Sequence, residues 1–195
     1  MEVILPNNKI MKIAVLVGSL RKESFNLKTV KAVKSLATKN LEMEIIEIGN
    51  LPHYNEDSDT DTPPSAWVSF RQKLKPFDGV LFFTPEYNRS IPAVLKNAID
   101  VGSRPYGQSV WSGKPAGVVS VSVGGQGGFG ANHALRQCLV FLDMPALQQP
   151  EVYIGGAAGL FDDDGKLTND KTKEFLQKFV DTYVQWVAKI KGIPL

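Results

Sequence analysis

The chain is poor in the side chains that most often bind metals or form covalent crosslinks. Its 195 residues include one cysteine, Cys138, and two histidines, His53 and His133, which lie far apart in the sequence. A single cysteine excludes an intrachain disulfide framework and a metal cluster held by several cysteines. Two distant histidines give little support to a histidine metal site or a Ser-His-Asp triad. Cys138 lies in an apolar helical pattern with Leu135 and Leu139, so we expect a buried, unreactive thiol.

Long apolar runs and a strong excess of one charge are also missing. No apolar run reaches the length of a membrane span, and residues 1–10 lack the apolar centre of a signal peptide. The formal net charge is +2, and no basic run indicates a nucleic-acid partner. A hydrophobic content of 43% is ordinary for one globular domain of this length. We therefore expect a single domain over residues 1–195, located in the cytoplasm, with no membrane or nucleic-acid partner.

Strand and helix patterns alternate along the whole chain. Short apolar or β-branched runs predict strands at 12–18, 41–48, 78–84, 116–123 and 146–154. Apolar residues at helical spacing predict helices at 24–40, 64–75, 92–101, 127–142 and 170–191. The alternation predicts an α/β fold, a three-layer α/β/α sandwich around a doubly wound, five-stranded parallel sheet. The strand at 41–48 alternates polar and apolar residues and is expected near the sheet edge, whereas the uniformly apolar strand at 78–84 is expected near its centre.

A loop rich in hydroxyl and amide side chains follows the first predicted strand. Residues 18–26 read Gly-Ser-Leu-Arg-Lys-Glu-Ser-Phe-Asn and lead into the first predicted helix. A helix N-terminus favours an anion, and Ser19, Arg21, Ser24 and Asn26 can add side-chain contacts to it. The loop matches neither a P-loop nor a dinucleotide glycine motif, so a terminal phosphate such as that of FMN is the expected ligand. Alternatively, Ser24 is an ordinary N-cap and the loop has no ligand.

Two further loops follow the third and fourth predicted strands. Residues 84–92 carry Tyr87, which can flank a flat ring, and Asn88, which can bond its polar edge. Residues 120–128 are rich in glycine, which lets a backbone approach a ligand closely. Taken alone, each loop could be a plain surface turn. Periodicity does not give the strand order, but in the flavodoxin-like order 2-1-3-4-5 a ligand would lie at the carboxyl ends of strands one and three, where these loops begin.

The longest predicted connection, residues 49–64, is acidic between Glu56 and Asp61. We expect it to be a solvated connection, because loops of this length and polarity usually run over the surface. The alternative is a subunit contact or a wall of the binding site.

Together these segments resemble the NADPH-dependent FMN reductases of flavodoxin-like fold, particularly their bacterial quinone and chromate reductase branch. The matching segments are residues 18–26, Pro85-Glu86-Tyr87-Asn88, Leu95-Lys96-Asn97-Ala98-Ile99-Asp100, Ser103-Arg104 and residues 124–137. The chain departs from many relatives where Val101 and Gly102 follow Asp100, a place where an aromatic residue is common, and at Pro92-Ala93, where glycine is common in second place. These departures concern substrate preference rather than flavin binding.

The resemblance implies FMN held noncovalently at the carboxyl edge of the sheet. The implied cofactor-binding residues are Ser19, Arg21, Ser24 and Asn26 at the phosphate with Phe25 beside them, Pro85, Glu86, Tyr87 and Asn88 along the isoalloxazine, and Ser122, Gly124 and Gly125 on its other side. The implied activity is hydride transfer from NADPH or NADH through FMN to quinones or other small oxidants, such as azo dyes or chromate, with no metal and no catalytic acid–base pair. The resemblance also implies a homodimer or homotetramer, in which Arg104 and Arg136 are interface or substrate contacts or else surface salt bridges.

Two other functions fit the residues less well. A flavodoxin-type electron carrier, or a redox sensor, would bind FMN without rapid NAD(P)H turnover. Such carriers are usually acidic, whereas the sequence pI here is about 8.6. A hydrolase or transferase would need a nucleophile beside a base, and the sequence places no histidine next to Ser24 or Ser90.

Overall fold

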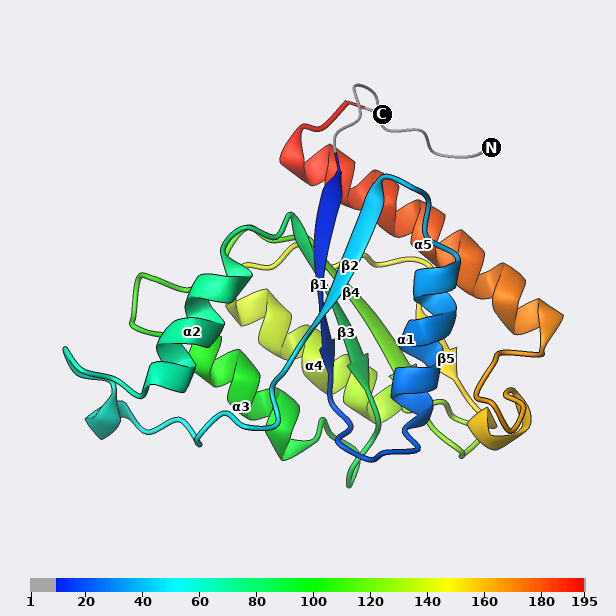
Figure 1. The fold of residues 1–195 in the computed structure, drawn as a ribbon, viewed down its shortest axis with the longest axis horizontal. Helices are drawn as coiled ribbons and strands as arrows, with labels where there is room; N and C mark the ends of the chain where they lie inside the picture. The colour runs from blue at the N-terminus through cyan, green and yellow to red at the C-terminus, as the bar shows by residue number, and fades with distance from the viewer. Residues whose placement is uncertain (1–9, 195) are drawn as a thin grey trace.

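The described residues form one parallel sheet in the predicted strand order. The computed structural model describes residues 10–194, so the prediction for residues 1–10 falls outside it except at Ile10. The strands are β1 (Met11–Val17), β2 (Leu41–Ile46), β3 (Gly79–Thr84), β4 (Ala116–Val121) and β5 (Val152–Ile154). They pair in parallel in the order β2-β1-β3-β4-β5 (Figure 1), which is the flavodoxin-like order.

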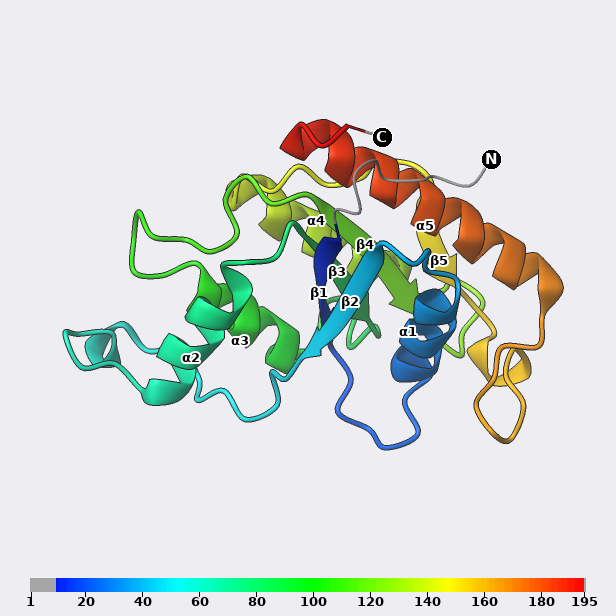
Figure 2. The ribbon, with the colours of Figure 1, turned by 45° about the horizontal axis from the view of Figure 1, so that its top comes forward.

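Helices cover both faces of this sheet and complete the predicted three-layer sandwich. They are α1 (Phe25–Ser35), α2 (Ser65–Leu74), α3 (Ala93–Gly102), α4 (Phe129–Phe141) and α5 (Asp170–Lys191), with short 3₁₀ turns η2 (Glu56–Ser58) and η3 (Ala157–Gly159). Helices α1 and α5 pack on one face, and α2, α3 and α4 pack on the other (Figures 1 and 2). Each face has its own apolar core, as expected for a doubly wound sheet.

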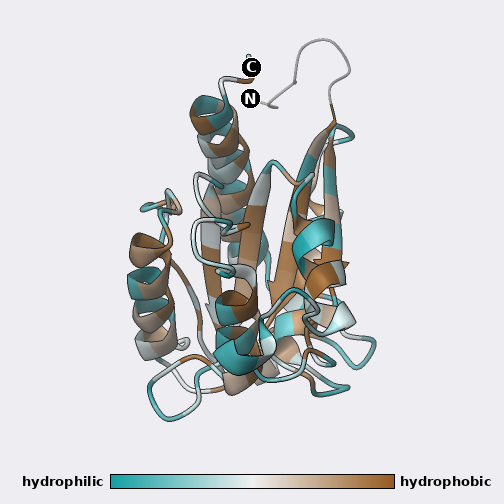
Figure 3. Cartoon of the chain, turned by 90° about the vertical axis from the view of Figure 1, so that its left-hand side faces the viewer, coloured by the Kyte–Doolittle hydropathy of each residue, from teal (hydrophilic) through white to brown (hydrophobic). Residues whose placement is uncertain are grey.

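The burial of each strand follows its sequence pattern. Strands β3 and β4 are buried along their whole length, while β2 alternates buried and exposed residues at the sheet edge, both as predicted. Hydrophobic colour follows the strands in Figure 3, whereas the helices alternate hydrophobic and hydrophilic bands. Large side chains fill the space between the layers: Trp67, Trp111 and Tyr183 are almost completely buried.

Several predicted strand ends are wrong. The last strand is not 146–154 but only Val152–Ile154, because Pro150 just before it has no N–H to donate to a ladder. Ala146 keeps a single isolated bridge to Ala116. The strand predicted at 41–48 ends at Ile46.

Two predicted helices are also shorter than their apolar patterns. The helix predicted at 24–40 ends at Ser35, although Leu36 and Ala37 still pack against the core from the following turn. The helix predicted at 127–142 begins at Phe129, because Gly127 and Gly128 have positive φ angles of 60° and 78°. The apolar spacing in the sequence therefore extends beyond the ends of these two helices, into residues that form turns.

Within residues 10–194, no helix has the length and apolarity needed to cross a membrane. The same part of the chain contains no group of three or more His, Cys, Asp or Glu side chains arranged to hold a metal ion.

Candidate functional site

The three predicted loops lie together at the carboxyl edge of the sheet, below the arrowheads in Figure 1. The amide of Gly18 donates to the carbonyl of Phe83 at 2.8 Å, which joins the starts of the first two loops. Arg89 of the second loop donates through Nη1 to Oε1 of Gln126 in the third loop at 3.0 Å. The sheet order therefore produces the convergence that the ligand prediction required.

The first loop presents a run of free backbone donors. No amide from Ser19 to Asn26 donates a hydrogen bond within the described residues. The last of these amides belong to the first turn of α1, where the backbone has no intrahelical acceptor and the helix dipole is positive. This arrangement suits a phosphate group, which accepts several hydrogen bonds at once.

Two side chains of the first loop have local structural roles. Ser24 is the N-cap of α1, and its Oγ accepts from the amide of Leu27 at 3.2 Å. The structure therefore shows Ser24 as an N-cap, as the alternative prediction had it. The Ser24 hydroxyl still has a proton to donate to a ligand. Phe25 packs against Phe161, with ring centroids 6.2 Å apart, and Lys28 Nζ lies over the Phe25 ring, 5.5 Å from its centroid. The Phe25 side chain is thus committed to packing, and only its backbone amide faces the loop as a free donor.

Asn26 carries an unsatisfied polar atom. Its side chain is 3% exposed, and its Oδ1 has no hydrogen-bond partner within the described residues. A buried amide oxygen without a donor costs free energy, so such a group usually has a ligand or water as its partner. FMN offers hydroxyl donors on its ribityl chain and acceptors on its phosphate, so the donor set of this loop fits that cofactor.

The second loop is a tight hairpin that holds Tyr87 outward. Tyr87 and Ser90 exchange two backbone hydrogen bonds of 2.9 Å, and the residues between them, Asn88 and Arg89, have φ angles of 50° and 67°. Two central residues with positive φ are the mark of a type I′ turn. The Tyr87 side chain is 54% exposed, so its ring is available to a flat ligand.

Glu86 does not direct its carboxylate toward a ring ligand. Its Oε2 accepts from the amide of Ala131 at 3.0 Å, in the first turn of α4, and its Oε1 lies 3.3 Å from Nη1 of Arg89. A carboxylate at a helix N-terminus is favourable, so the side chain of Glu86 ties the second loop to α4. Only the backbone of Glu86 remains for the predicted contact with the isoalloxazine.

The third loop brings its backbone to the surface at two glycines. Ser122 accepts through Oγ from the amide of Gly124 at 3.1 Å, and its own amide donates to the carbonyl of Ile154. A side chain at Gly125 would meet nothing within 4 Å, so this part of the loop is open to a close approach. Ser122, Gly124 and Gly125 thus form one side of the edge where the other two loops end.

Exposed apolar side chains around these loops were missed by the sequence prediction. The loops or their first helical residues expose Leu20 (61%), Val123 (63%) and Phe129 (52%), in addition to Tyr87. Their signal was present in the sequence as single apolar residues within otherwise polar or glycine-rich loops. Exposed apolar groups gathered at one edge indicate a surface that contacts an apolar ring or partner.

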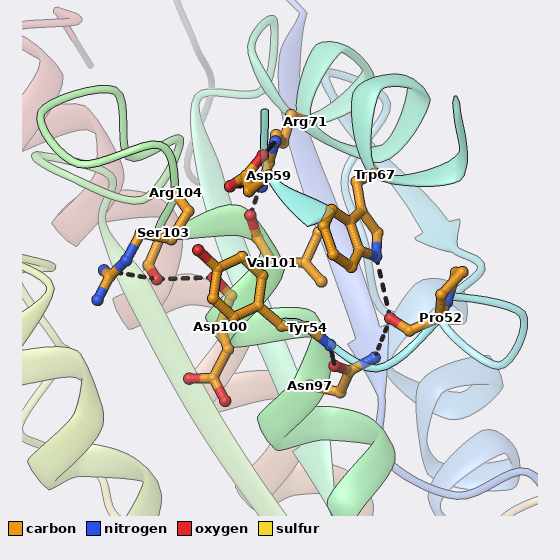
Figure 4. Close-up of polar contacts among 10 residues, drawn as sticks. All are labelled: Pro52, Tyr54, Asp59, Trp67, Arg71, Asn97, Asp100, Val101, Ser103 and Arg104. Carbon is orange, nitrogen blue, oxygen red and sulfur yellow. Dashed lines mark hydrogen bonds and ion pairs between the residues drawn. The ribbon is translucent and has the colours of Figure 1, made fainter. Parts of the chain in front are cut away.

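The acidic connection at 49–64 is anchored more firmly than a solvated loop (Figure 4). Asn97 of α3 accepts from the amide of Tyr54 and donates to the carbonyls of Leu51 and Pro52. Asp59 forms a two-pronged ion pair with Arg71, at 2.8 and 2.9 Å. Most of the segment is exposed as predicted, but the Asp59 side chain is only 4% exposed. Burial and the nearby Asp59 carboxylate raise the pKa of Tyr54 above its ordinary value.

Three other predicted positions lie away from the loops. Cys138 is partly exposed rather than fully buried, and burial raises the pKa of its thiol, as expected for an unreactive cysteine. Arg104 donates to Ser103 Oγ, and Arg136 donates to Asn132 Oδ1 and the carbonyl of Leu147. Neither arginine has a carboxylate partner within the described residues, so neither forms the predicted surface salt bridge.

The chain matches known proteins over nearly its whole length. The sequence model of the family described as NADPH-dependent FMN reductase matches residues 11–159. A quinone reductase of Pseudomonas putida is 63% identical over 186 residues, covering 95% of this chain and 100% of that protein.

Two solved structures support the same placement. The flavoenzyme NAD(P)H:(acceptor) oxidoreductase FerB of Paracoccus denitrificans is 43% identical with a TM-score of 0.86, covering 92% of this chain and 98% of that one. A flavodoxin variant of Pseudomonas aeruginosa, 17% identical with a TM-score of 0.54 and covering 89% and 99%, shares the fold alone. The free amides, the hairpin and the open glycines thus lie on a flavodoxin-like sheet, and the chain belongs to the NADPH-dependent FMN reductase family, in its bacterial quinone reductase branch.

Proposed function

We propose that the protein is an FMN-dependent NAD(P)H:quinone oxidoreductase. The observation that carries this proposal is the first loop, where eight consecutive amides and the buried Oδ1 of Asn26 have no partner in the described chain. A phosphate with an adjacent polyhydroxyl chain satisfies both kinds of group. The relatives named as quinone reductase and as NAD(P)H:(acceptor) oxidoreductase supply the donor and the acceptor class.

The protein's own residues would bind and orient the reactants. The amides of the first loop hold the phosphate together with Ser19, Arg21 and the side-chain NH₂ of Asn26, while Asn26 Oδ1 accepts from a hydroxyl of the adjacent chain. Ser24 shapes the helix end. The hairpin at Tyr87 and Asn88, with Pro85 and the backbone of Glu86, borders the isoalloxazine. The open backbone at Gly124 and Gly125, next to Ser122, lets the ring lie close to the third loop.

Bound FMN supplies the acceptance and release of hydride, so the chain needs no acid–base pair of its own. The exposed apolar side chains of Leu20, Val123 and Phe129 surround the same edge. They would exclude water from a flat acceptor and contribute no specific polar contact. We therefore propose that several quinones are substrates, and that azo dyes or chromate are further acceptors.

The test is anaerobic reduction of the FMN-loaded protein. Purified protein is mixed with FMN and NADPH, and absorbance near the flavin band is followed. We expect rapid bleaching that is reversed when a quinone is added. Binding without bleaching would instead assign the protein to the electron carriers or redox sensors, and failure to bind FMN would contradict the reading of the first loop.

We also propose that residues 1–195 act as one FMN-binding domain in the cytoplasm and that this domain self-associates. Helix α4 exposes Val140 (80%) and Phe141 (81%) side by side, next to a cavity of about 380 Å³ between α3 and α4 that Arg104 also lines. An apolar projection and an adjacent hollow on the same face suit an interface between two identical subunits. A homodimer through this face, or a tetramer built from it, is the proposed assembly.

A further inference from the structure

A cavity of about 340 Å³ lies on the face of the sheet that α1 and α5 cover. Its walls are the second half of α1, the segment between β5 and α5, and the N-terminal end of α5, which lie next to one another in Figures 1 and 2. None of the residues predicted to bind FMN lines it. Its volume is within the range of small-molecule sites. The cavity is therefore a second candidate site, separate from the one proposed for the flavin.

One wall of the cavity is a short hairpin, residues 161–167, whose ends form an isolated antiparallel bridge. The amide of Lys166 donates to Oδ1 of Asp162 at 2.8 Å within the hairpin. The hairpin rests on α1, because Cε of Lys28 would lie only 3.2 Å from a Cβ at Gly165. These contacts hold the walls in place without a ligand, and a preformed site lowers the entropy cost of binding.

The part of the lining nearest the core is apolar. Leu36 at the end of α1 and Leu167 of the hairpin are both partly buried against the core, and Ala32 lines the cavity beside them. Covering these side chains removes apolar surface from water, which favours a ligand with an apolar body.

Three lysines from three different elements surround this apolar part: Lys31 of α1, Lys166 of the hairpin and Lys173 of α5. Within residues 10–194 their ammonium groups have no printed hydrogen bond or ion pair to another side chain. The one carboxylate in the lining belongs to Asp164, and the negative end of the α1 dipole is offset by the positive end of α5. Three ammonium groups against one carboxylate favour an anion, and a single negative charge does not exceed the excess.

We propose that this cavity binds a small amphipathic carboxylate, with its apolar body on Leu36 and Leu167 and its carboxylate among the three lysines. The proposal does not depend on the proposed function, because the cavity lies outside the flavin site and binding involves no redox step.

The test uses 2-naphthoate as the probe and 2-naphthamide as its uncharged counterpart. Each is titrated by calorimetry into the FMN-saturated protein and into the FMN-free protein. We expect naphthoate to bind about 5- to 10-fold more tightly than naphthamide at low salt, and this difference to disappear at about 1 M salt. FMN should not change the affinity for naphthoate. Absence of naphthoate binding, equal binding of the two probes at low salt, or loss of naphthoate binding when FMN is added would overturn the proposal.

Substitutions in the lining locate the bound probe. We expect Lys166→Ala and Lys173→Ala each to weaken naphthoate binding about 2- to 5-fold, the scale of one exposed charge pair, and Asp164→Asn to strengthen it. Lys178→Ala is the matched control, because Lys178 is an exposed lysine of α5 outside the lining. Naphthamide binding should change little in all four variants. If Lys166→Ala and Lys173→Ala bind naphthoate as Lys178→Ala does, or if Asp164→Asn weakens binding, the carboxylate does not lie among these lysines.

A variant that fills the cavity tests its position without removing a charge. Ser35 is an exposed residue of α1 that lines the cavity, and Ser35→Trp should place an indole ring there. We expect this variant to lose the binding of both probes while its circular dichroism stays that of the wild type. Unchanged binding by a folded Ser35→Trp variant would show that the probes bind elsewhere.

Discussion

Among the charged side chains of the first and second loops, Arg21 has no hydrogen-bond or ion-pair partner within residues 10–194. Arg89 is bound to Glu86 and Gln126, whereas Arg21 is exposed on the first loop beside free amides. We therefore expect Arg21→Ala to weaken FMN binding by about 1.5–3 kcal/mol, the scale of a hydrogen bond to a charged group. Fluorescence titration of FMN measures the change, with Lys31→Ala as a control. Unchanged affinity would remove Arg21 from the phosphate site.

Tyr153 gives the protein a predictable response to alkali. Burial, together with the hydrogen bond and charge of Glu151, raises the pKa of its hydroxyl to about 12 from an ordinary value of 10.0. Its hydroxyl also lies 2.9 Å from Nε2 of His133. Between about pH 10 and 12 the folded state retains a proton that the unfolded state releases, so this contribution to stability falls as pH rises.

We expect Tyr153→Phe to lose part of that alkaline decrease in the free energy of unfolding. Denaturant unfolding at several pH values between about 9 and 12 measures how steeply the free energy of unfolding falls as pH rises. A pH of about 9 lies below the pKa of Tyr153 in both the folded and the unfolded state. Tyr106→Phe is the matched control, because Tyr106 is 88% exposed. If the two variants show the same slope as the wild type, Tyr153 does not carry the effect.

Residue chemistry predicted the free donors of the first loop better than it predicted the direction of each side chain. The hydroxyls and amides of residues 18–26 correctly indicated a loop with free donors at a helix N-terminus. The side chains of Glu86 and Phe25, in contrast, are engaged with α4 and with Phe161. These partners lie 45 and 136 residues away along the chain, respectively, so local sequence could not reveal them.

At the scale of elements, the acidic connection and α2 are joined by a buried ion pair. The side chains of Arg71 and Asp59 are 10% and 4% exposed, and Arg71 Nε also donates to the carbonyl of Val101 at the end of α3. Arg71→Met leaves the Asp59 carboxylate buried without its partner, so we expect a loss of about 3 kcal/mol in the free energy of unfolding. Urea denaturation measures this loss.

A double variant separates the buried charge from the loss of packing. Arg71→Met with Asp59→Leu removes both charges and should recover much of the stability, since an apolar pair can replace a buried ion pair. Lys73→Met is the control, because its bond to Glu44 is half exposed and should contribute less than about 1 kcal/mol. A single variant as stable as the control would mean that the ion pair does not anchor the connection.

Periodicity predicted whether each segment is a helix or a strand, but it did not predict the residue at which each element begins or ends. Apolar spacing identified the strands and long helices because each has one or two faces against a core. The same spacing continued through Leu36 and Ala37, which pack on the core without being helical, and through residues 146–151, where the chain runs beside β4 with almost no ladder. Burial and hydrogen bonding are therefore separate constraints, and sequence periodicity reports only the first.

At the scale of the whole molecule, the two faces of the sandwich differ in what they leave exposed. Helix α5 buries seven side chains against the sheet, including Phe179, Tyr183 and Val187. Helix α4 buries fewer and leaves Val140 and Phe141 almost fully exposed at its C-terminal end. An apolar patch of this kind on an otherwise ordinary surface indicates a contact with another protein. The face that carries α3 and α4 is therefore the part of the molecule expected to meet a second copy.

We expect Phe141→Asp to convert the assembly into monomers, because it places a charge in an interface that would be buried in both subunits. Sedimentation velocity across a range of protein concentrations measures the change. Ile190→Asp is the control, since Ile190 is 38% exposed on α5, the opposite face of the sheet. Circular dichroism of both variants establishes that the fold is kept. A wild type that sediments as a monomer at every concentration, or a Phe141→Asp variant that still associates, would show that this face is not the interface.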